Sequence, residues 1–164
     1  MRPVLKDPSA SGPDPVYTVY KDLENSWINK TELADGLYGD EFPKTFGHYH
    51  ADGKDEIYKI ESGSGLLLLQ SDTNVFLITV KSGERIKIPH QYGHAWINIG
   101  DIPLVSYDDH KDPQDNYEPV AIKHGLAYYV ISDHGQPKAV VNPNYVNPPS
   151  PQWLTAEEFN GKQS

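Results

Sequence analysis

The middle of the chain is a series of short segments in which apolar residues alternate with polar ones or run together. Turn-forming residues such as Gly, Ser, Asp and Asn separate these segments. We expect seven strands here, at residues 45–50, 56–61, 65–70, 75–80, 85–88, 94–99 and 103–107. Many short strands at nearly regular spacing predict an all-β sandwich or barrel.

The flanking segments extend this organisation. Further strands are expected at residues 16–20, in a short stretch that begins at Thr31, and at residues 126–132 and 138–142. Residues 108–119 are expected to form a polar loop. Residues 1–15 are rich in Pro, Ser, Asp and Gly and predict an extended, flexible arm. We therefore expect one barrel domain at residues 16–142.

The C-terminal segment, residues 143–164, contains prolines at positions 143, 148, 149 and 151. Prolines at this density do not fit a regular strand or helix, so we expect an irregular tail that packs on the barrel or on a partner subunit. Within it, Thr155 precedes Ala-Glu-Glu-Phe and is a suitable cap for one helical turn.

Length and charge limit the classes of function. A chain of 164 residues suits one compact domain with a core. A formal net charge of -9 argues against nucleic acid as a partner, because phosphate backbones require a basic surface. The absence of cysteine excludes disulfides and thiolate metal sites. No apolar run is long enough to span a membrane and the start lacks a signal-like apolar stretch, so a cytoplasmic location is expected.

Four residues form a candidate metal site. His48 and His50 are two residues apart, so both imidazoles leave the same face of an extended strand. Glu56 follows a turn-forming segment and can return to the same point on the next strand. His94 lies on a later strand and supplies a third imidazole.

Three neutral imidazoles and one carboxylate around a divalent cation leave a net charge of about +1 and, at six-coordination, about two open positions. Two neighbouring open positions suit a substrate with two adjacent oxygens. Such a centre can stabilise negative charge that develops on oxygen. Fe, Mn, Ni, Co and Zn are all compatible with these residue types.

Two segments resemble the motifs of the cupin superfamily. The first contains His48, His50, Glu56 and Gly63, and the second runs from Gly83 through Pro89 and His94 to Asn98. One departure is that Gln91 stands where the second motif carries a glycine, and Gly93 is a possible substitute. The resemblance implies a double-stranded β-helix, that is, a jelly-roll barrel.

Further segments narrow the resemblance. Residues 14–142 are similar to the cupin-type glucose-6-phosphate isomerases of archaea and some bacteria. The segments that carry this similarity are Tyr17-Thr-Val-Tyr, Thr31-Glu-Leu-x-x-Gly, Thr45-x-Gly47-His-x-His, Glu56-x-Tyr58, Gly65-Leu-Leu-Leu-Leu-Gln70 and Asn98-Ile-Gly-Asp-x-Pro103.

The resemblance implies roles for named residues. One divalent metal, with Fe expected first, would be bound by His48, His50, Glu56 and His94. The phosphate of the substrate would be held by residues that match the family's phosphate site, which are Tyr17, Thr31, Thr45 and Gly47. Tyr117 matches a tyrosine in the family's late active-site loop, and His110 replaces another tyrosine expected there, with Tyr107 nearby. A homodimer is also implied.

The implied reaction interconverts glucose 6-phosphate and fructose 6-phosphate through a cis-enediol, a step of glycolysis and gluconeogenesis. The resemblance makes Glu56 the candidate base and Tyr58 an assisting group. Whether Glu56 transfers the proton or is only a metal ligand stays open, and a hydride shift is a second possible mechanism. Two other readings stay open at this point. One is a metal-dependent cupin dioxygenase, and the other is a sugar-binding cupin without catalytic activity.

Overall fold

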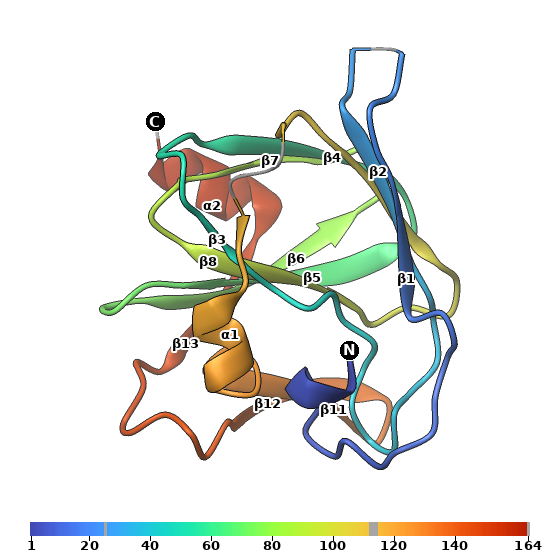
Figure 1. Ribbon diagram of the computed structural model, residues 1–164, viewed down its shortest axis with the longest axis vertical. Coiled ribbons are helices and arrows are strands. Elements are labelled where there is room, and N and C mark those ends of the chain that lie inside the picture. Colours follow the sequence, from blue (N-terminus) through green and yellow to red (C-terminus); the bar gives the residue numbers. More distant parts are fainter. Residues whose placement is uncertain (25, 112–114, 164) are drawn as a thin grey trace.

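Two β-sheets stacked on one another form the body of the computed structural model, which describes residues 1–24, 26–111 and 115–163 (Figure 1). The larger sheet has the order β1 (Tyr17–Tyr20), β2 (Asn29–Leu33), β9 (Leu104–Asp108), β4 (Glu56–Ser62) and β7 (Arg85–Ile88). The second has the order β13 (Pro151–Thr155), β6 (Val75–Lys81), β5 (Ser64–Gln70) and β8 (Gly93–Asn98). The all-β expectation is confirmed.

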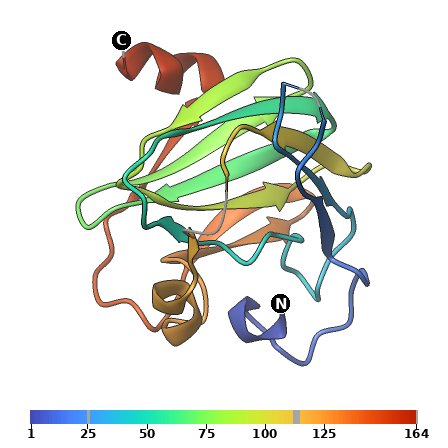
Figure 2. The ribbon, with the colours of Figure 1, turned by 45° about the horizontal axis from the view of Figure 1, so that its top comes forward.

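Smaller elements complete the molecule. One two-stranded ribbon pairs β3 (Tyr49–His50) with β10 (Asp115–Asn116), and another pairs β11 (Tyr128–Asp133) with β12 (Gln136–Val141). The helices are a short 3-10 helix (Arg2–Val4), α1 (Glu118–Ile122) and α2 (Ala156–Lys162). The 3-10 helix and α2 lie toward opposite ends of the molecule (Figure 2).

The second sheet is buried on both faces, which explains the run of four leucines in β5. Leu67 and Leu69 point into the core shared with the larger sheet, beside Ile60 of β4. Leu66 and Leu68 point the other way, into a core shared with the segment that leads into β11. A strand covered on both sides has no polar face, so its sequence does not alternate.

The expected strand at residues 45–50 is shorter than predicted. Regular pairing is limited to β3, with isolated bridges from Lys44 to Ile97 and from His48 to His94. The cause is Gly47, whose φ of +87° is a left-handed conformation that interrupts an extended strand. Gly47 precedes both histidines, and the rings of His48 and His50 lie near each other as their spacing predicts, with centroids 5.5 Å apart.

The N-terminal residues pack against the body, where we expected a flexible arm. The side chains of Val4 and Leu5 are 0% and 2% exposed, and each belongs to one of the two cores. The backbone N–H of Lys6 also donates to the carboxylate of Glu41 over 2.7 Å. Apolar side chains inside this polar segment supply the burial that its overall composition hides.

The C-terminal tail is more regular than expected. Its strand β13 runs parallel to β6, and α2 follows directly. Thr155 caps α2 as predicted, because its hydroxyl accepts from the N–H of Glu158 while the Glu158 side chain accepts from the N–H of Thr155. Phe159 anchors the helix in the core.

The expected polar loop at residues 108–119 contains β10 and the start of α1, and residues 112–114 lie outside the described part of the chain. The division of the chain into an arm, a barrel at residues 16–142 and a tail stays a prediction.

Candidate active site

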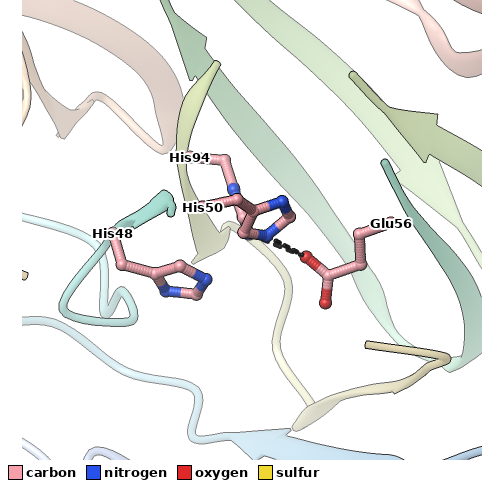
Figure 3. A group of neighbouring side chains, drawn as sticks. All are labelled: His48, His50, Glu56 and His94. Atoms are coloured by element: carbon pink, nitrogen blue, oxygen red, sulfur yellow. Dashed lines mark hydrogen bonds and ion pairs between the residues drawn. The ribbon is translucent and has the colours of Figure 1, made fainter. Parts of the chain in front are cut away.

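Four side chains from distant parts of the chain meet between the two sheets (Figure 3). His48 precedes β3 and His50 ends it, Glu56 begins β4, and His94 lies in β8. One ligand atom from each of the four lies within 4.8 Å of the others. Reciprocal backbone hydrogen bonds join His48 to His94, with N···O distances of 3.1 and 3.0 Å, so the strand pairing itself brings the two rings together.

Glu56 is the central charge of this group. Its Oε2 lies 2.8 Å from Nε2 of His50 and 3.3 Å from Nε2 of His94. Burial would raise the pKa of Glu56, but the hydrogen bond with His50, the close approach of His94 and the charges of both rings outweigh burial and hold the pKa well below its ordinary value. The carboxylate is therefore an anion at neutral pH.

The imidazole nitrogens of His48 and His94 are suited to bind a cation. Burial, and next the charge of His94, lower the pKa of His48 to about 2, so this imidazole is neutral at physiological pH. Nε2 of His48 and both ring nitrogens of His94 are buried and make no hydrogen bond in the described part of the chain. Buried polar atoms without partners are costly, and a cation would satisfy them. The cluster thus fits a single divalent metal.

The pH dependence of metal binding should follow His50. Burial lowers its pKa, but the hydrogen bond and charge of Glu56 and the carbonyl of Lys54 outweigh burial and raise the pKa above 6.5. Protonated His50 therefore stabilises the folded apoprotein. This contribution is fully present below pH 6.5 and is lost as the pH rises through the raised pKa of His50. Because only the neutral imidazole binds metal, we expect metal affinity to increase as the pH rises above 6.5, with release of a proton.

Calorimetric titration of metal into the apoprotein measures this release when it is repeated in two buffers of different ionisation enthalpy. Metal binding without proton release between pH 6 and 8, whichever buffer is used, would contradict the expectation.

Gly93, the possible substitute for the missing motif glycine, is needed for close packing rather than for a turn. It does not adopt a positive φ. Instead, a Cβ at this position would lie 2.4 Å from the ring of Tyr49. Glycine is needed because Tyr49, which stands between the two ligands of the His-x-His pair, packs directly against the backbone that precedes His94.

Two small cavities adjoin the cluster, with volumes of about 60 and 80 Å³. The first, here called the hydroxyl cavity, is lined by Tyr17, Thr31, Thr45, Gly47, His94 and Trp96 among others. The second, here called the acidic cavity, is lined by Lys21, Asn29, Glu56, Asp108, His110 and Asp115 among others. Both share the residues Val19, Thr31, His48, Tyr58 and Tyr117. The cluster therefore stands where the two cavities meet.

The predicted substrate-binding residues thus separate into two groups. Tyr17, Thr45 and Gly47 line the hydroxyl cavity, His110 lines the acidic cavity, and Thr31 lines both. Tyr117 lines both and its ring centroid lies 5.2 Å from that of His48.

His110 contacts the metal cluster and does not line the hydroxyl cavity. Its ring stacks on that of His50 with a centroid distance of 4.2 Å and an interplanar angle of 8°. Its Nε2 lies 3.4 Å from Oδ1 of Asp115 and 3.8 Å from Oδ2 of Asp52. The position that departs from the family pattern therefore lies among carboxylates.

Three further residues on the inner face of the sheet have distinct positions. Tyr58 is buried, and burial, together with the charges of Glu56 and Asp108, raises its pKa well above the ordinary value, so the phenol keeps its proton. Trp96 is buried against Tyr58, with ring centroids 5.1 Å apart. Asn98 donates to three backbone carbonyls and stabilises the fold.

Asn29 and Asp108 were not singled out from the sequence, although both line the acidic cavity. A signal was present. Asn29 and Thr31 alternate in β2, and Ser106 and Asp108 alternate in β9, all on the buried face of the sheet. Polar residues at inward positions of a strand indicate either a cavity lined by polar side chains or a buried hydrogen-bond network. The strand pattern alone does not distinguish these two cases.

Comparison with known proteins decides the family. The model of the family described as "Glucose-6-phosphate isomerase (GPI)" matches residues 14–147. The chain belongs to this family. A glucose-6-phosphate isomerase of Pyrococcus furiosus is 32% identical over 135 residues, which cover 79% of this chain and 71% of that protein. A glucose-6-phosphate isomerase of Sinorhizobium medicae is 30% identical over 106 residues, which cover 63% of this chain and 50% of that protein.

Solved structures confirm the fold of this family member. An oxalate oxidase in complex with the substrate analogue glycolate superposes with a TM-score of 0.50 and 16% identity, over 68% of this chain and 61% of that chain. At this identity the likeness concerns the fold alone, and it agrees with the predicted cupin jelly roll. No helix in the described residues is long and apolar enough to cross a membrane.

Proposed function

We propose that the protein is a metal-dependent aldose–ketose isomerase that interconverts glucose 6-phosphate and fructose 6-phosphate. The observation that carries the proposal is the meeting of His48, His50, Glu56 and His94 at the junction of two cavities, in a chain of the glucose-6-phosphate isomerase family. The small size of each cavity favours a substrate that lies across both.

The proposed cofactor is one divalent transition metal per chain, held by the three histidines and Glu56. We expect Fe, with Mn, Ni, Co and Zn as compatible alternatives. When bound, the metal would supply electrostatic stabilisation of negative charge on the sugar oxygens.

The hydroxyl cavity is the proposed phosphate site. The Thr45 hydroxyl accepts from the N–H of Trp96 over 3.0 Å, so its own proton is free to be donated to a ligand. The amide of Gly47 makes no hydrogen bond within the described part of the chain, and its positive φ sets it apart from the strand ladder. Tyr17 and Thr31 complete a set of neutral donors that suits a phosphate.

Glu56 and Tyr58 are the proposed proton-transfer groups. Glu56 is the proposed base, because it is an anion at neutral pH and can accept a proton in the buried site. Tyr58 keeps its proton and stands two residues along the same strand, so it can donate a hydrogen bond to a sugar oxygen. In a cis-enediol reaction, the base removes the proton at C2 and returns it to C1, while a proton passes from O2 to O1.

The direct test is to incubate purified, metal-loaded protein with fructose 6-phosphate and to measure glucose 6-phosphate. We expect isomerisation that depends on metal. Oxygen consumption by the Fe-loaded protein without isomerisation would contradict the proposal and indicate a dioxygenase. Binding of the sugar phosphate without turnover would also contradict it and indicate a sugar-binding cupin.

The Thr45→Val variant tests the phosphate site. Valine keeps the shape but removes the donor, so we expect KM for fructose 6-phosphate to rise about tenfold or more, the effect of a lost hydrogen bond to a charged group. The N–H of Trp96 also loses its acceptor, which should cost about 1–3 kcal/mol of stability. Steady-state kinetics and thermal unfolding measure the two effects.

Two matched variants separate binding from folding. Thr45→Ser keeps the hydroxyl and should restore KM, whereas Thr79→Val changes an exposed strand residue far from the cluster and should leave KM unchanged. An unchanged KM in Thr45→Val would contradict a phosphate role for this residue.

Several features remain predictions. These are a homodimer, a cytoplasmic location and a place in glycolysis and gluconeogenesis. The choice between a cis-enediol and a hydride shift also awaits experiment.

A further inference from the structure

The inner face of the larger sheet carries a row of polar side chains across three neighbouring strands. Asp108 of β9 is directly opposite Asn29 of β2 on one side and Tyr58 of β4 on the other. Side chains in such cross-strand pairs lie within contact distance. Because Glu56 stands two residues before Tyr58, the row leads from the edge of the acidic cavity to the metal cluster.

Asp108 is held in one orientation. Its Oδ1 accepts from Nδ2 of Asn29 over 2.7 Å and from the backbone N–H of His110 over 3.0 Å. Nδ2 of Asn29 also donates to the carbonyl of His110 over 2.7 Å, which fixes the amide. Both hydrogen bonds that Asp108 accepts from the described residues go to Oδ1, so Oδ2 has no such partner although the side chain lines the acidic cavity.

Burying a carboxyl group at the position of Asp108 costs free energy, which packing alone does not require. The residue is 4% exposed and shares its cavity with the carboxylates of Glu56 and Asp115. Oδ2 of such a carboxylate is stabilised by a hydrogen-bond donor, and a ligand hydroxyl in the cavity can supply one. The neutral hydroxyls of a sugar are suitable donors.

The charges of the two cavities orient the substrate. The acidic cavity is lined by the carboxyl groups of Glu56, Asp108 and Asp115 and by the single lysine Lys21, so acidic groups outnumber basic ones, whereas the hydroxyl cavity offers neutral donors. A phosphate is therefore favoured in the hydroxyl cavity. With the phosphate in the hydroxyl cavity and the cluster between the two cavities, the far end of the sugar lies in the acidic cavity. In a hexose 6-phosphate this end is C1 with its oxygen, O1.

We propose that Asp108 is a substrate-binding residue whose Oδ2 accepts a hydrogen bond from the O1 hydroxyl of glucose 6-phosphate. Asn29 is then a positioning residue, because it holds the carboxylate of Asp108 without facing the sugar oxygen itself. The inference rests on the proposed isomerase function and adds a specific contact at the sugar end of the site.

The electrostatics of the residue agree with this role. Burial, and next the charge of Glu56, raise the pKa of Asp108 to about 7. A hydroxyl that donates to Oδ2 would favour the ionised form and offset part of the burial cost.

The test compares two ligands that differ only at O1. One is glucose 6-phosphate, and the other is 1,5-anhydroglucitol 6-phosphate, which lacks the O1 hydroxyl and acts as an inhibitor. In Asp108→Asn we expect KM for glucose 6-phosphate to rise about tenfold or more, while the inhibition constant of the anhydro compound changes less than about twofold. The matched control, Asp101→Asn in an exposed loop, should change neither value.

The outcomes are distinct. A purely structural role for Asp108 would raise both constants equally, and that result, or an unchanged KM, would overturn the inference. If the wild-type protein isomerises no sugar phosphate, it is the proposed function that fails.

A second variant keeps the inference testable if Asp108→Asn does not fold. Asn29→Ser leaves the carboxylate in place but removes one of the two donors that orient it, while the N–H of His110 remains. We expect a smaller rise in KM for glucose 6-phosphate, again with little change for the anhydro compound. Equal effects on both ligands in this variant would overturn the assignment of Asp108 to O1.

Discussion

Replacing His48 with alanine is expected to remove nearly all bound metal and nearly all isomerase activity. His48 is neutral at physiological pH because burial lowers its pKa to about 2, and its Nε2 makes no hydrogen bond within the described residues. Its main contribution is therefore to the cation, so the loss should appear in metal content more than in folding. Elemental analysis of the purified variant and the fructose 6-phosphate assay measure both quantities.

The matched control for His48→Ala is His134→Asn. His134 lies at the turn between β11 and β12, its side chain is 98% exposed, and asparagine tolerates its positive φ. This variant should bind metal and act like the wild type. Full metal content and activity in His48→Ala would show that the ligand set is wrong.

Glu56→Gln is the second change with a large expected effect. Glutamine keeps the shape of the side chain but removes the negative charge that lies between His50 and His94. We expect weaker metal binding. At saturating metal we also expect kcat to fall by about a hundredfold or more, the usual cost of losing a general base. Kinetics across a metal titration separate these two losses.

Exchange with solvent identifies the role of the carboxylate more closely. If Glu56 moves the proton between C2 and C1, the wild type should incorporate deuterium from heavy water into the sugar, and the metal-saturated variant should not. A variant that recovers full kcat at saturating metal would show that Glu56 is a ligand and not the base.

The variant should also lose a pH-dependent contribution to stability. The pKa of Glu56 is lowered on folding, so its contribution is present above the ordinary value of 4.5 and is lost as the pH falls below it. The apoprotein of Glu56→Gln should therefore show a flatter stability profile in acid than the wild type.

Local patterns predicted most of the strands because strand alternation and turn residues act over a few positions. The same cues failed in part for residues 45–50, where the positive φ of Gly47 interrupts the extended backbone and regular pairing begins only at Tyr49. They also missed the burial of Val4 and Leu5 and the parallel pairing of β13 with β6, because these depend on contacts with distant residues.

The metal cluster could be predicted from the sequence because its residues stand at fixed spacings in two motifs. The four residues of the cluster stand in two motifs, and the structure brings them within 4.8 Å of each other. Asn29 and Asp108, by contrast, are 79 residues apart and become neighbours only through the pairing of β2 with β9. No local pattern contains that information.

The central claim is that one divalent metal in the His48, His50, Glu56 and His94 cluster makes this protein a sugar-phosphate isomerase. The most direct measurement is to strip the wild-type protein of metal with a chelator, assay fructose 6-phosphate isomerisation, and then add metal back in known amounts. We expect loss of activity on stripping and full recovery at one metal ion per chain. Full activity in the stripped protein, or none after metal is restored, would contradict it.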